Sequence, residues 1–160
     1  MARTWFQRSI WSIGAVIGCT AIPTAALAGS LIEGIWLTAE KSEMTIAPCA
    51  EGHCGYITKI VVPQHIIDQY GDELEAIGTN FTDYMNKDPA LRNRPIQGLQ
   101  ILTLRQAADP WHYEGEVYNP QDGNTYAGFI EVVDQDRIKL KGCAMMVLCQ
   151  EQLWTRVPTQ

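Results

Sequence analysis

After residue 28 the sequence consists mostly of short runs in which apolar and polar residues alternate, separated by polar turns. A period of two places every second side chain on the same face of a strand. The clearest run is 137–141, where Ile138 and Leu140 share one face. Eight runs predict strands over 34–38, 43–47, 55–62, 99–104, 115–118, 126–133, 137–141 and 153–157. Short strands with tight connections favour an antiparallel barrel or sandwich, and a closed barrel has no exposed edges.

One segment departs from this period and predicts an amphipathic helix over 63–77, although Gly71 weakens it. Its apolar residues recur at helical spacing: Ile66, Ile67, Tyr70, Leu74 and Ile77. The residues 81–98, rich in Asn, Asp and Pro, predict a long connection before the sheet resumes. The helix is expected either to cover one end of the barrel or to decorate its surface.

The first 28 residues have the pattern of a secretory signal peptide, and residues 29–160 are expected to form a single domain. Two arginines precede an apolar stretch over 10–22, and Ala26-Leu27-Ala28 supplies small residues for cleavage near Ala28. An alternative interpretation takes Val16-Ile-Gly-Cys19 as a lipoprotein box, with a lipid anchor on Cys19. No later apolar run is long enough for a transmembrane helix. The protein is therefore expected to be exported, to the periplasm or beyond.

Removing the signal peptide changes both the charge and the cysteine count. It takes away two arginines and no acid, so the net charge of −6 becomes −8, which disfavours nucleic acid as a partner. It also takes away Cys19 and leaves four cysteines in two close pairs. An even set in an oxidising compartment predicts disulfides, and the pairs Cys49–Cys54 and Cys143–Cys149 close the shortest loops. A zinc site or a redox pair is the alternative, but neither pair has C-x-x-C spacing.

An ordered series of motifs runs through the chain after the predicted signal peptide. These are Gly34-x-Trp36, Cys49, Cys54-Gly-Tyr-Ile57, Asn86-x-Asp88-Pro89-x-x-Arg92-x-Arg94-Pro95-x-x-Gly98-Leu99, Trp111-x-x-x-Gly115-x-x-Tyr118-Asn119-Pro120-x-Asp122-Gly123-x-x-Tyr126, Gly142-Cys143 and Trp154-Thr-Arg156. The series resembles the uncharacterised bacterial family known as domain of unknown function 2147. The resemblance implies a small exported barrel of lipocalin or calycin type, here a single antiparallel up-and-down barrel of about eight strands with one helical insertion. It implies no reaction.

The inventory of reactive residues argues against several classes of enzyme. Ser30 and Ser42 are the only serines after residue 28, and neither lies in G-x-S-x-G. The three histidines are far apart, and no glycine-rich phosphate loop or dinucleotide fingerprint is present. We assign no catalytic residue, metal site or cofactor from the sequence. A non-enzymatic role is therefore favoured.

The candidate ligand-binding residues are an arginine pair and a set of aromatic residues. Arg92 and Arg94 share one side of an extended segment and are suited to grip a carboxylate or phosphate, or to tie the long connection to acidic neighbours and backbone carbonyls. Aromatic residues on or beside the strands either line a barrel mouth or fill the barrel. With Arg156, the aromatic candidates are Trp36, Trp111, Tyr118, Tyr126 and Trp154.

These observations lead to three hypotheses from different classes. The first is a barrel that binds a small ligand or a partner in the cell envelope. The second is a glycan-acting envelope hydrolase that uses Glu114 and Glu116, two carboxylates beside aromatic residues. The third is a purely structural or interaction module in which the helix after Pro63 docks on a partner. The sequence leaves the ligand and the oligomeric state open.

Overall fold

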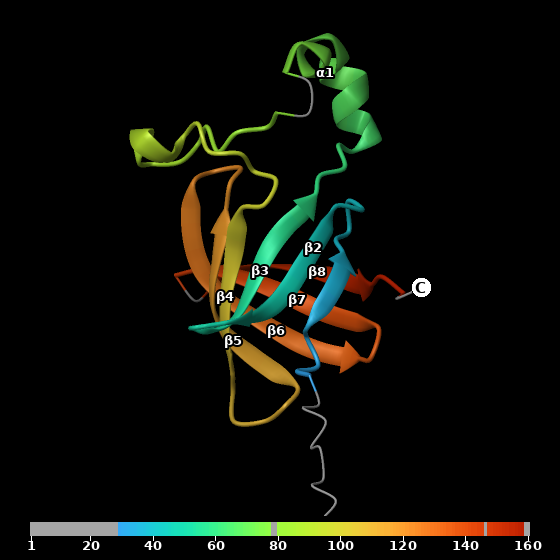
Figure 1. Ribbon diagram of the computed structural model, residues 1–160, viewed down its shortest axis with the longest axis vertical. Coiled ribbons are helices and arrows are strands. Elements are labelled where there is room, and N and C mark those ends of the chain that lie inside the picture. Colours follow the sequence, from blue (N-terminus) through green and yellow to red (C-terminus); the bar gives the residue numbers. More distant parts are fainter. Residues whose placement is uncertain (1–28, 78–79, 146, 159–160) are drawn as a thin grey trace, which may run out of the picture.

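The computed structural model describes residues 29–77, 80–145 and 147–158, so the predicted signal peptide and the Cys19 alternative lie outside the described residues. Eight antiparallel strands follow one another in chain order around a closed barrel (Figure 1). The strands are β1 (Gly34–Leu37), β2 (Glu43–Cys49), β3 (Gly52–Lys59), β4 (Gln100–Gln106), β5 (His112–Asn119), β6 (Asn124–Asp134), β7 (Arg137–Ala144) and β8 (Leu148–Arg156). The predicted up-and-down barrel is confirmed.

Alternation along the strands places one face of each in the barrel interior. On β7, Ile138 and Leu140 point inward, and Lys139 and Lys141 point outward, as their spacing predicts. Side chains from all eight strands and from the segment before β1 fill the interior, which is where the hydrophobic effect stabilises the fold. These buried residues are Ile32, Trp36, Met44, Ile46, Ile57, Leu102, Leu104, Tyr113, Ile130, Val132, Ile138, Leu140 and Trp154.

The largest difference from the predicted strands is at β8, which begins at Leu148 rather than near 153. The register with β7 is continuous from Arg137↔Thr155 to Ala144↔Leu148 and includes Cys143↔Cys149. The residues 148–152 do not look like a strand because they are mostly polar, but pairing with β7 and the disulfide hold them extended. The result is a long hairpin.

The predicted helix is present as α1 (Gln64–Ile77), between β3 and β4. It is interrupted at Tyr70, whose φ of −131° and ψ of 21° are not helical, next to the glycine that weakens the pattern. Figure 1 shows α1 projecting beyond one end of the barrel, followed by a long connection that contains the short helix η1 (Pro89–Leu91). No helix within the described ranges has the length and apolar character needed to cross a bilayer.

The barrel closes through a short seam between its first and last strands. β1 pairs with β8 only at Trp36↔Arg156 and Leu37↔Thr155. The guanidinium of Arg156 stacks 4.1 Å from the ring centroid of Trp36, which is fully buried. Its Nη1 and Nη2 donate to the carbonyls of Glu33 and Leu31, both at 2.6 Å, and its Nε donates to the carbonyl of Gln135 at 2.7 Å. One side chain therefore ties β8, the segment before β1 and the β6–β7 turn together.

The variant Arg156→Lys tests this closure. A lysine cannot bind three carbonyls in a planar fork while stacking on an indole, so we expect the free energy of unfolding to fall by about 2 kcal/mol. Urea titration followed by tryptophan fluorescence measures the change. The control is Arg137→Lys, an exposed arginine at the same end of the barrel, which should change the midpoint little. Equal midpoints for the two variants would contradict the role assigned to Arg156.

Candidate functional site

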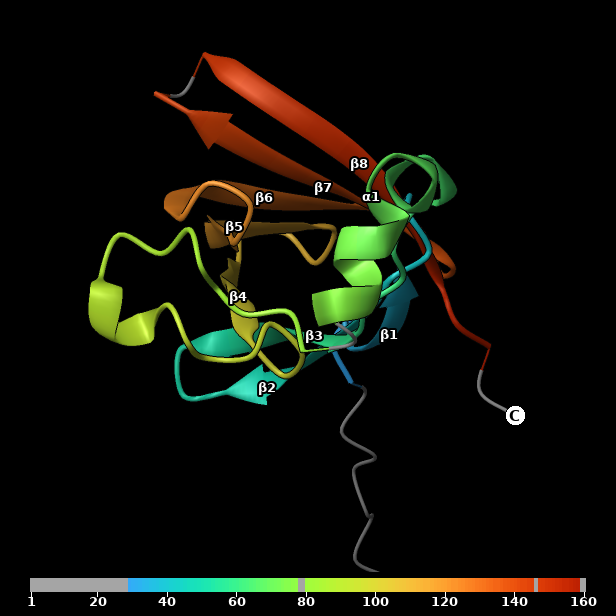
Figure 2. The ribbon, with the colours of Figure 1, turned by 90° about the horizontal axis from the view of Figure 1, so that it is seen from above.

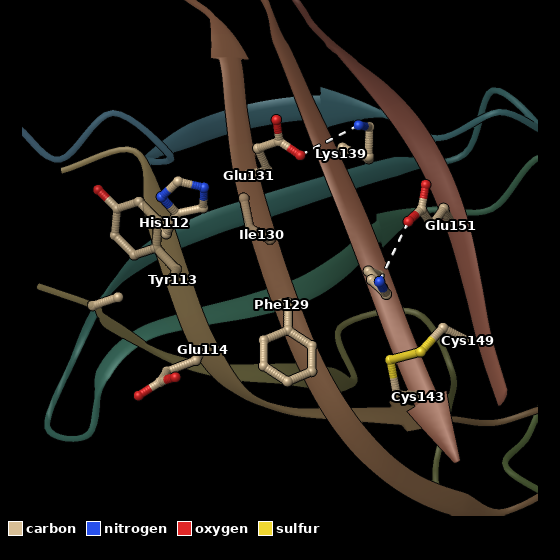
Figure 3. A pocket seen from close by; sticks show the side chains of 12 residues that line it. His112, Tyr113, Glu114, Phe129, Ile130, Glu131, Lys139, Cys143, Cys149 and Glu151 are labelled. Atoms are coloured by element: carbon tan, nitrogen blue, oxygen red, sulfur yellow. Dashed lines mark hydrogen bonds and ion pairs between the residues drawn. A yellow bond between two sulfur atoms is a disulfide. The ribbon is translucent and has the colours of Figure 1, made fainter. Parts of the chain in front are cut away.

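Two open grooves lie on the outer face of the sheet formed by β4 to β8. The first, of about 390 Å³, lies over β5 to β8, and the second, of about 550 Å³, lies over β4 to β6. Both grooves are lined by Glu114 and Phe129, so they adjoin across these two residues. Figure 3 shows the first groove, with Phe129 between Glu114 and the Cys143–Cys149 disulfide. The core residues Tyr113 and Ile130 also line the first groove.

The strand register explains why these side chains meet. Residues that face each other on neighbouring strands form a row across the outer face, in the order Arg105, Glu114, Phe129, Lys141 and Glu151. Cross-strand partners in such a row lie close enough to contact each other. A row over five strands spans about 19 Å at the usual strand spacing. The outer face therefore offers a strip of alternating charge with an aromatic ring in the middle.

The lysines of this face are already paired, but two carboxylates are not. Lys139 Nζ lies 3.3 Å from Glu131 Oε2, and Lys141 Nζ lies 3.6 Å from Glu151 Oε1. Among the described residues, Glu114 and Glu116 form no ion pair within 4.0 Å, although both line the second groove and are exposed. Phe129 is 37% exposed beside them. Arg105 also lines the second groove, where its Nε donates to the carbonyl of Glu51, so the two carboxylates remain available for a further positive charge beside the exposed ring.

A polar cluster around Asp83 fastens the long connection after α1 to the end of the strands opposite the β1–β8 seam. Asp83 is fully buried, and its carboxylate accepts hydrogen bonds from Tyr118 Oη at 2.6 Å and Asn86 Nδ2 at 2.8 Å. Arg94 donates to the same carboxylate from Nε at 2.8 Å and lies 2.7 Å away at Nη2. Arg92 Nε donates to the carbonyl of Asn86 at 2.8 Å. The cluster satisfies a buried charge with hydrogen-bonding partners from two segments.

The same contacts shift the pKa values within the cluster. Burial alone would raise the pKa of Asp83, but hydrogen bonds from Tyr118, Asn86 and Arg94 outweigh it and hold this pKa below the ordinary 3.8. Burial and the hydrogen bond to Asp83 raise the pKa of Tyr118. At neutral pH the cluster is therefore an ionised aspartate surrounded by donors, a stable structural arrangement.

The β5–β6 turn fits under this connection. Gly123 has a φ of +68°, and a Cβ there would meet the carbonyl oxygen of Met85. Asp122 accepts a hydrogen bond from Tyr126 Oη at 2.6 Å, and its pKa is lowered because this bond and those from Asn124 and Asn119 outweigh the effect of burial. The close approach requires glycine, which explains the Asp122-Gly123 pair.

The structure separates the predicted ligand-binding residues into two groups. One group lies at the end of the barrel where β1 and β8 meet, and its two indoles are buried in the core: Trp36, Trp154 and Arg156. Arg92, Arg94, Tyr118 and Tyr126 lie at the other end, in or beside the Asp83 cluster. Trp111 is half exposed in the β4–β5 turn, near the first groove but not among the residues that line it. The arginines thus have partners within the chain, and the two groups do not form one site.

Both predicted disulfides are confirmed, Cys49–Cys54 across the β2–β3 turn and Cys143–Cys149 across the β7–β8 hairpin. Cys49, Glu51 and Cys54 are close enough to hold a metal ion, but the two sulfurs are bonded to each other and offer no thiolate. The described residues therefore provide no convincing metal site.

Sequence reasoning missed the outer groove and the centre of the polar cluster. In the sequence, Phe129, Lys139 and Lys141 are only parts of predicted strands, and it is the register of β6 with β7 that brings them together. Asp83 has one signal, its position three residues before Asn86 at the start of the arginine-rich motif. That signal is weak because most aspartates in such a connection are exposed.

The chain resembles a known family in sequence and a solved structure in fold. The model of a family described as "Uncharacterized protein conserved in bacteria (DUF2147)" matches residues 34–156. Among solved structures, protein HP1028 from Helicobacter pylori, described as belonging to the lipocalin family, has a similar fold with a TM-score of 0.63. The two are 18% identical, and the match covers 81% of this chain and 85% of that one, which supports the fold alone. No curated protein matches the sequence.

The Asp83 cluster predicts a pH-dependent stability. The variant Asp83→Asn should lower the free energy of unfolding by about 2 kcal/mol at pH 7, because it removes the buried charge that Arg94 pairs with. A lowered carboxyl pKa stabilises the fold above its ordinary 3.8, so the difference between variant and parent should shrink as the pH falls below 3.8.

Urea titrations at several pH values measure this difference. The control is Asp134→Asn, which removes an exposed aspartate that also pairs with an arginine and should matter much less. A difference that persists unchanged at pH 3 would contradict the ionised state assigned to Asp83.

Proposed function

The chain belongs to this DUF2147 family of uncharacterized bacterial proteins, and from that premise and the barrel's geometry we propose that it is an exported, non-enzymatic binding protein. Its ligand lies on the outer face of β4 to β8 rather than inside the barrel. The ligand is extended and polar, and carries a cationic group beside an apolar portion.

One observation supports the outer site most strongly. The two adjoining grooves contain a pair of carboxylates without ion-pair partners, Glu114 and Glu116, beside the exposed ring of Phe129. An amine or guanidinium would form charge-assisted hydrogen bonds with the carboxylates, while the adjacent part of the ligand packs on the ring. Among the described residues, Trp36, Tyr113 and Trp154 are buried in the interior at the end where β1 and β8 meet.

Export is supported by the chemistry of the first described residues and of the cysteines. Ile32 is buried in the core, and Ser30 Oγ lies 2.6 Å from Tyr113 Oη, so a cleavage after Ala28 leaves every residue needed for these contacts. Two disulfides are typical of proteins that fold in an oxidising compartment. The acidic balance of the chain fits a role away from nucleic acid.

A hydrolytic role for the same carboxylates has weaker support. Glu114 and Glu116 share one face of β5, and their spacing of two residues, about 7 Å, suits a pair acting across a glycosidic bond. A general acid, however, normally needs burial in an apolar site to keep its proton at neutral pH. Both side chains are exposed, which favours binding over catalysis.

The carboxylate pair can be tested with a defined probe, the acetylated and amidated dipeptide Phe-Lys. Binding followed by NMR should shift the ring signals of Phe129, and the double variant Glu114→Gln, Glu116→Gln should weaken it about tenfold. The dipeptide Phe-norleucine, which lacks the charge, should bind the parent protein weakly. The control variant is Asp136→Asn, an acid-to-amide change in the β6–β7 turn outside both grooves.

The outcomes of this experiment distinguish a binding protein from a hydrolase. Equal affinity of the double variant would place the ligand elsewhere. Turnover of cell-wall glycan fragments that disappears in the double variant would instead favour the hydrolase.

Cleavage of the predicted signal peptide can be tested by measuring the mass of the intact protein. We expect the intact protein recovered from an exporting bacterium to begin at Gly29 and to lack the four hydrogens of two disulfides. Mass spectrometry without reduction checks both points at once. A chain that begins at an acylated Cys19 would replace free export by a lipid anchor.

A further inference from the structure

The last strand of the barrel has a long edge without a partner. β8 pairs with β7 along its whole length, but β1 reaches it only at Thr155 and Arg156. On the β1 side, residues 148–154 therefore have no strand partner among the described strands. Figure 2 shows the β7–β8 hairpin extending away from the rest of the barrel at this point. The closed barrel thus retains one open edge.

The backbone groups on that edge can be identified from the seam. Val157 N donates to the carbonyl of Ile35 at 2.8 Å, so the backbone of Val157 faces β1. Strand residues alternate in the direction of their N–H and C=O groups. Those of Cys149, Glu151 and Leu153 consequently point out of the open edge. Each is a donor and an acceptor available to another strand.

Most of the features that usually protect an edge strand are missing between Leu148 and Trp154. Between Leu148 and Trp154 there is no proline or lysine, and the register with β7 has no bulge. All side chains from Leu148 to Leu153 are exposed. At the hairpin tip, Met145, Val147 and Leu148 are 82%, 78% and 66% exposed. The one charge between Leu148 and Trp154 is Glu151, which pairs with Lys141 of the same chain, so an edge with apolar residues at its end is suited to pairing with another chain.

We propose that this edge pairs with the same edge of a second copy of the chain, giving a two-fold symmetric dimer with a continuous sheet. The register places Gln150 opposite Gln150 of the second copy. Glu151 then faces Cys149 of the second copy, and Leu153 faces Val147. The edge-facing residues 149 and 151 form the hydrogen-bonded pairs, so about four main-chain bonds join the two strands.

The side chains fit this register better than the register whose axis lies one residue further along β8. A residue on a two-fold axis must complement itself, and an amide does so because it both donates and accepts. An axis one residue further on would place Glu151 opposite Glu151 and bring two like charges together. In the proposed register each Glu151 keeps its own Lys141 at 3.6 Å, so no uncompensated like charges meet. The exposed Leu153 is covered by the apolar tip of the other copy.

Pairing would also extend the outer face. Cys149 and Glu151 line the β8 side of the first groove, where the sheet of one chain ends. A second β8 would continue the sheet and give that groove a further wall. The dimer stands independently of the ligand proposed above, since it rests on the backbone edge and the hairpin tip.

The test is a charge exchange at the axis. Sedimentation velocity of the exported protein with both disulfides formed should show a dimer at concentrations of about 10 to 200 µM. Gln150→Lys and Gln150→Glu each place like charges face to face and should weaken the dimer about tenfold. A mixture of the two variants should restore dimers, because unlike charges then meet across the axis.

The control is Gln135→Lys, the same change in the exposed β6–β7 turn, which should dimerise like the parent. A monomeric parent, or variants that dimerise as the parent does, would overturn the proposal. So would a parent that is monomeric but sediments with phosphatidylglycerol vesicles in a manner lost in Val147→Asp, since the tip would then belong to a membrane. Failure here leaves the Phe-Lys result unaffected, so the two proposals are separable.

Discussion

The fold depends on the contact between Arg156 and Trp36, because the seam between β1 and β8 is too short to close the barrel by itself. Two residue pairs join these strands. The guanidinium adds three hydrogen bonds to carbonyls from separate segments and covers the buried indole. An arginine can do this because its fork is planar and its charge is weakly hydrated. The contact therefore joins backbone closure to core packing.

This way of closing the barrel determines how its two ends are occupied. The interior is filled by large side chains at the end where Arg156 stacks on Trp36. The opposite end is occupied by the long connection, which Asp83 and Arg94 fasten to Tyr118. Arginines that could have gripped an anion are thus used to hold the chain together. The outer face of the sheet keeps exposed charged and aromatic side chains.

The sequence predicted the barrel well because alternation is a local property. Ile138 and Leu140 identify their strand and its inward face from five residues, and the two close cysteine pairs after residue 28 identify the disulfides. The groove could not be found in this way. Phe129 meets Glu114 only through the register of β5 with β6, and register follows from the packing of the whole sheet. Asp83 was missed for a related reason, since its burial depends on Tyr118, which lies far along the chain.

The open edge of β8 also follows from the shortness of β1. β1 has four residues and β8 has nine, so β1 leaves most of the β8 edge that faces it without a partner. The short first strand that makes Arg156 necessary therefore also exposes the hairpin. The Cys143–Cys149 bond holds that hairpin together. A free hairpin with this edge would be prone to uncontrolled strand pairing, whereas a clamped one presents a single register. The disulfide thus limits the partners that the edge can accept, as a specific interface requires.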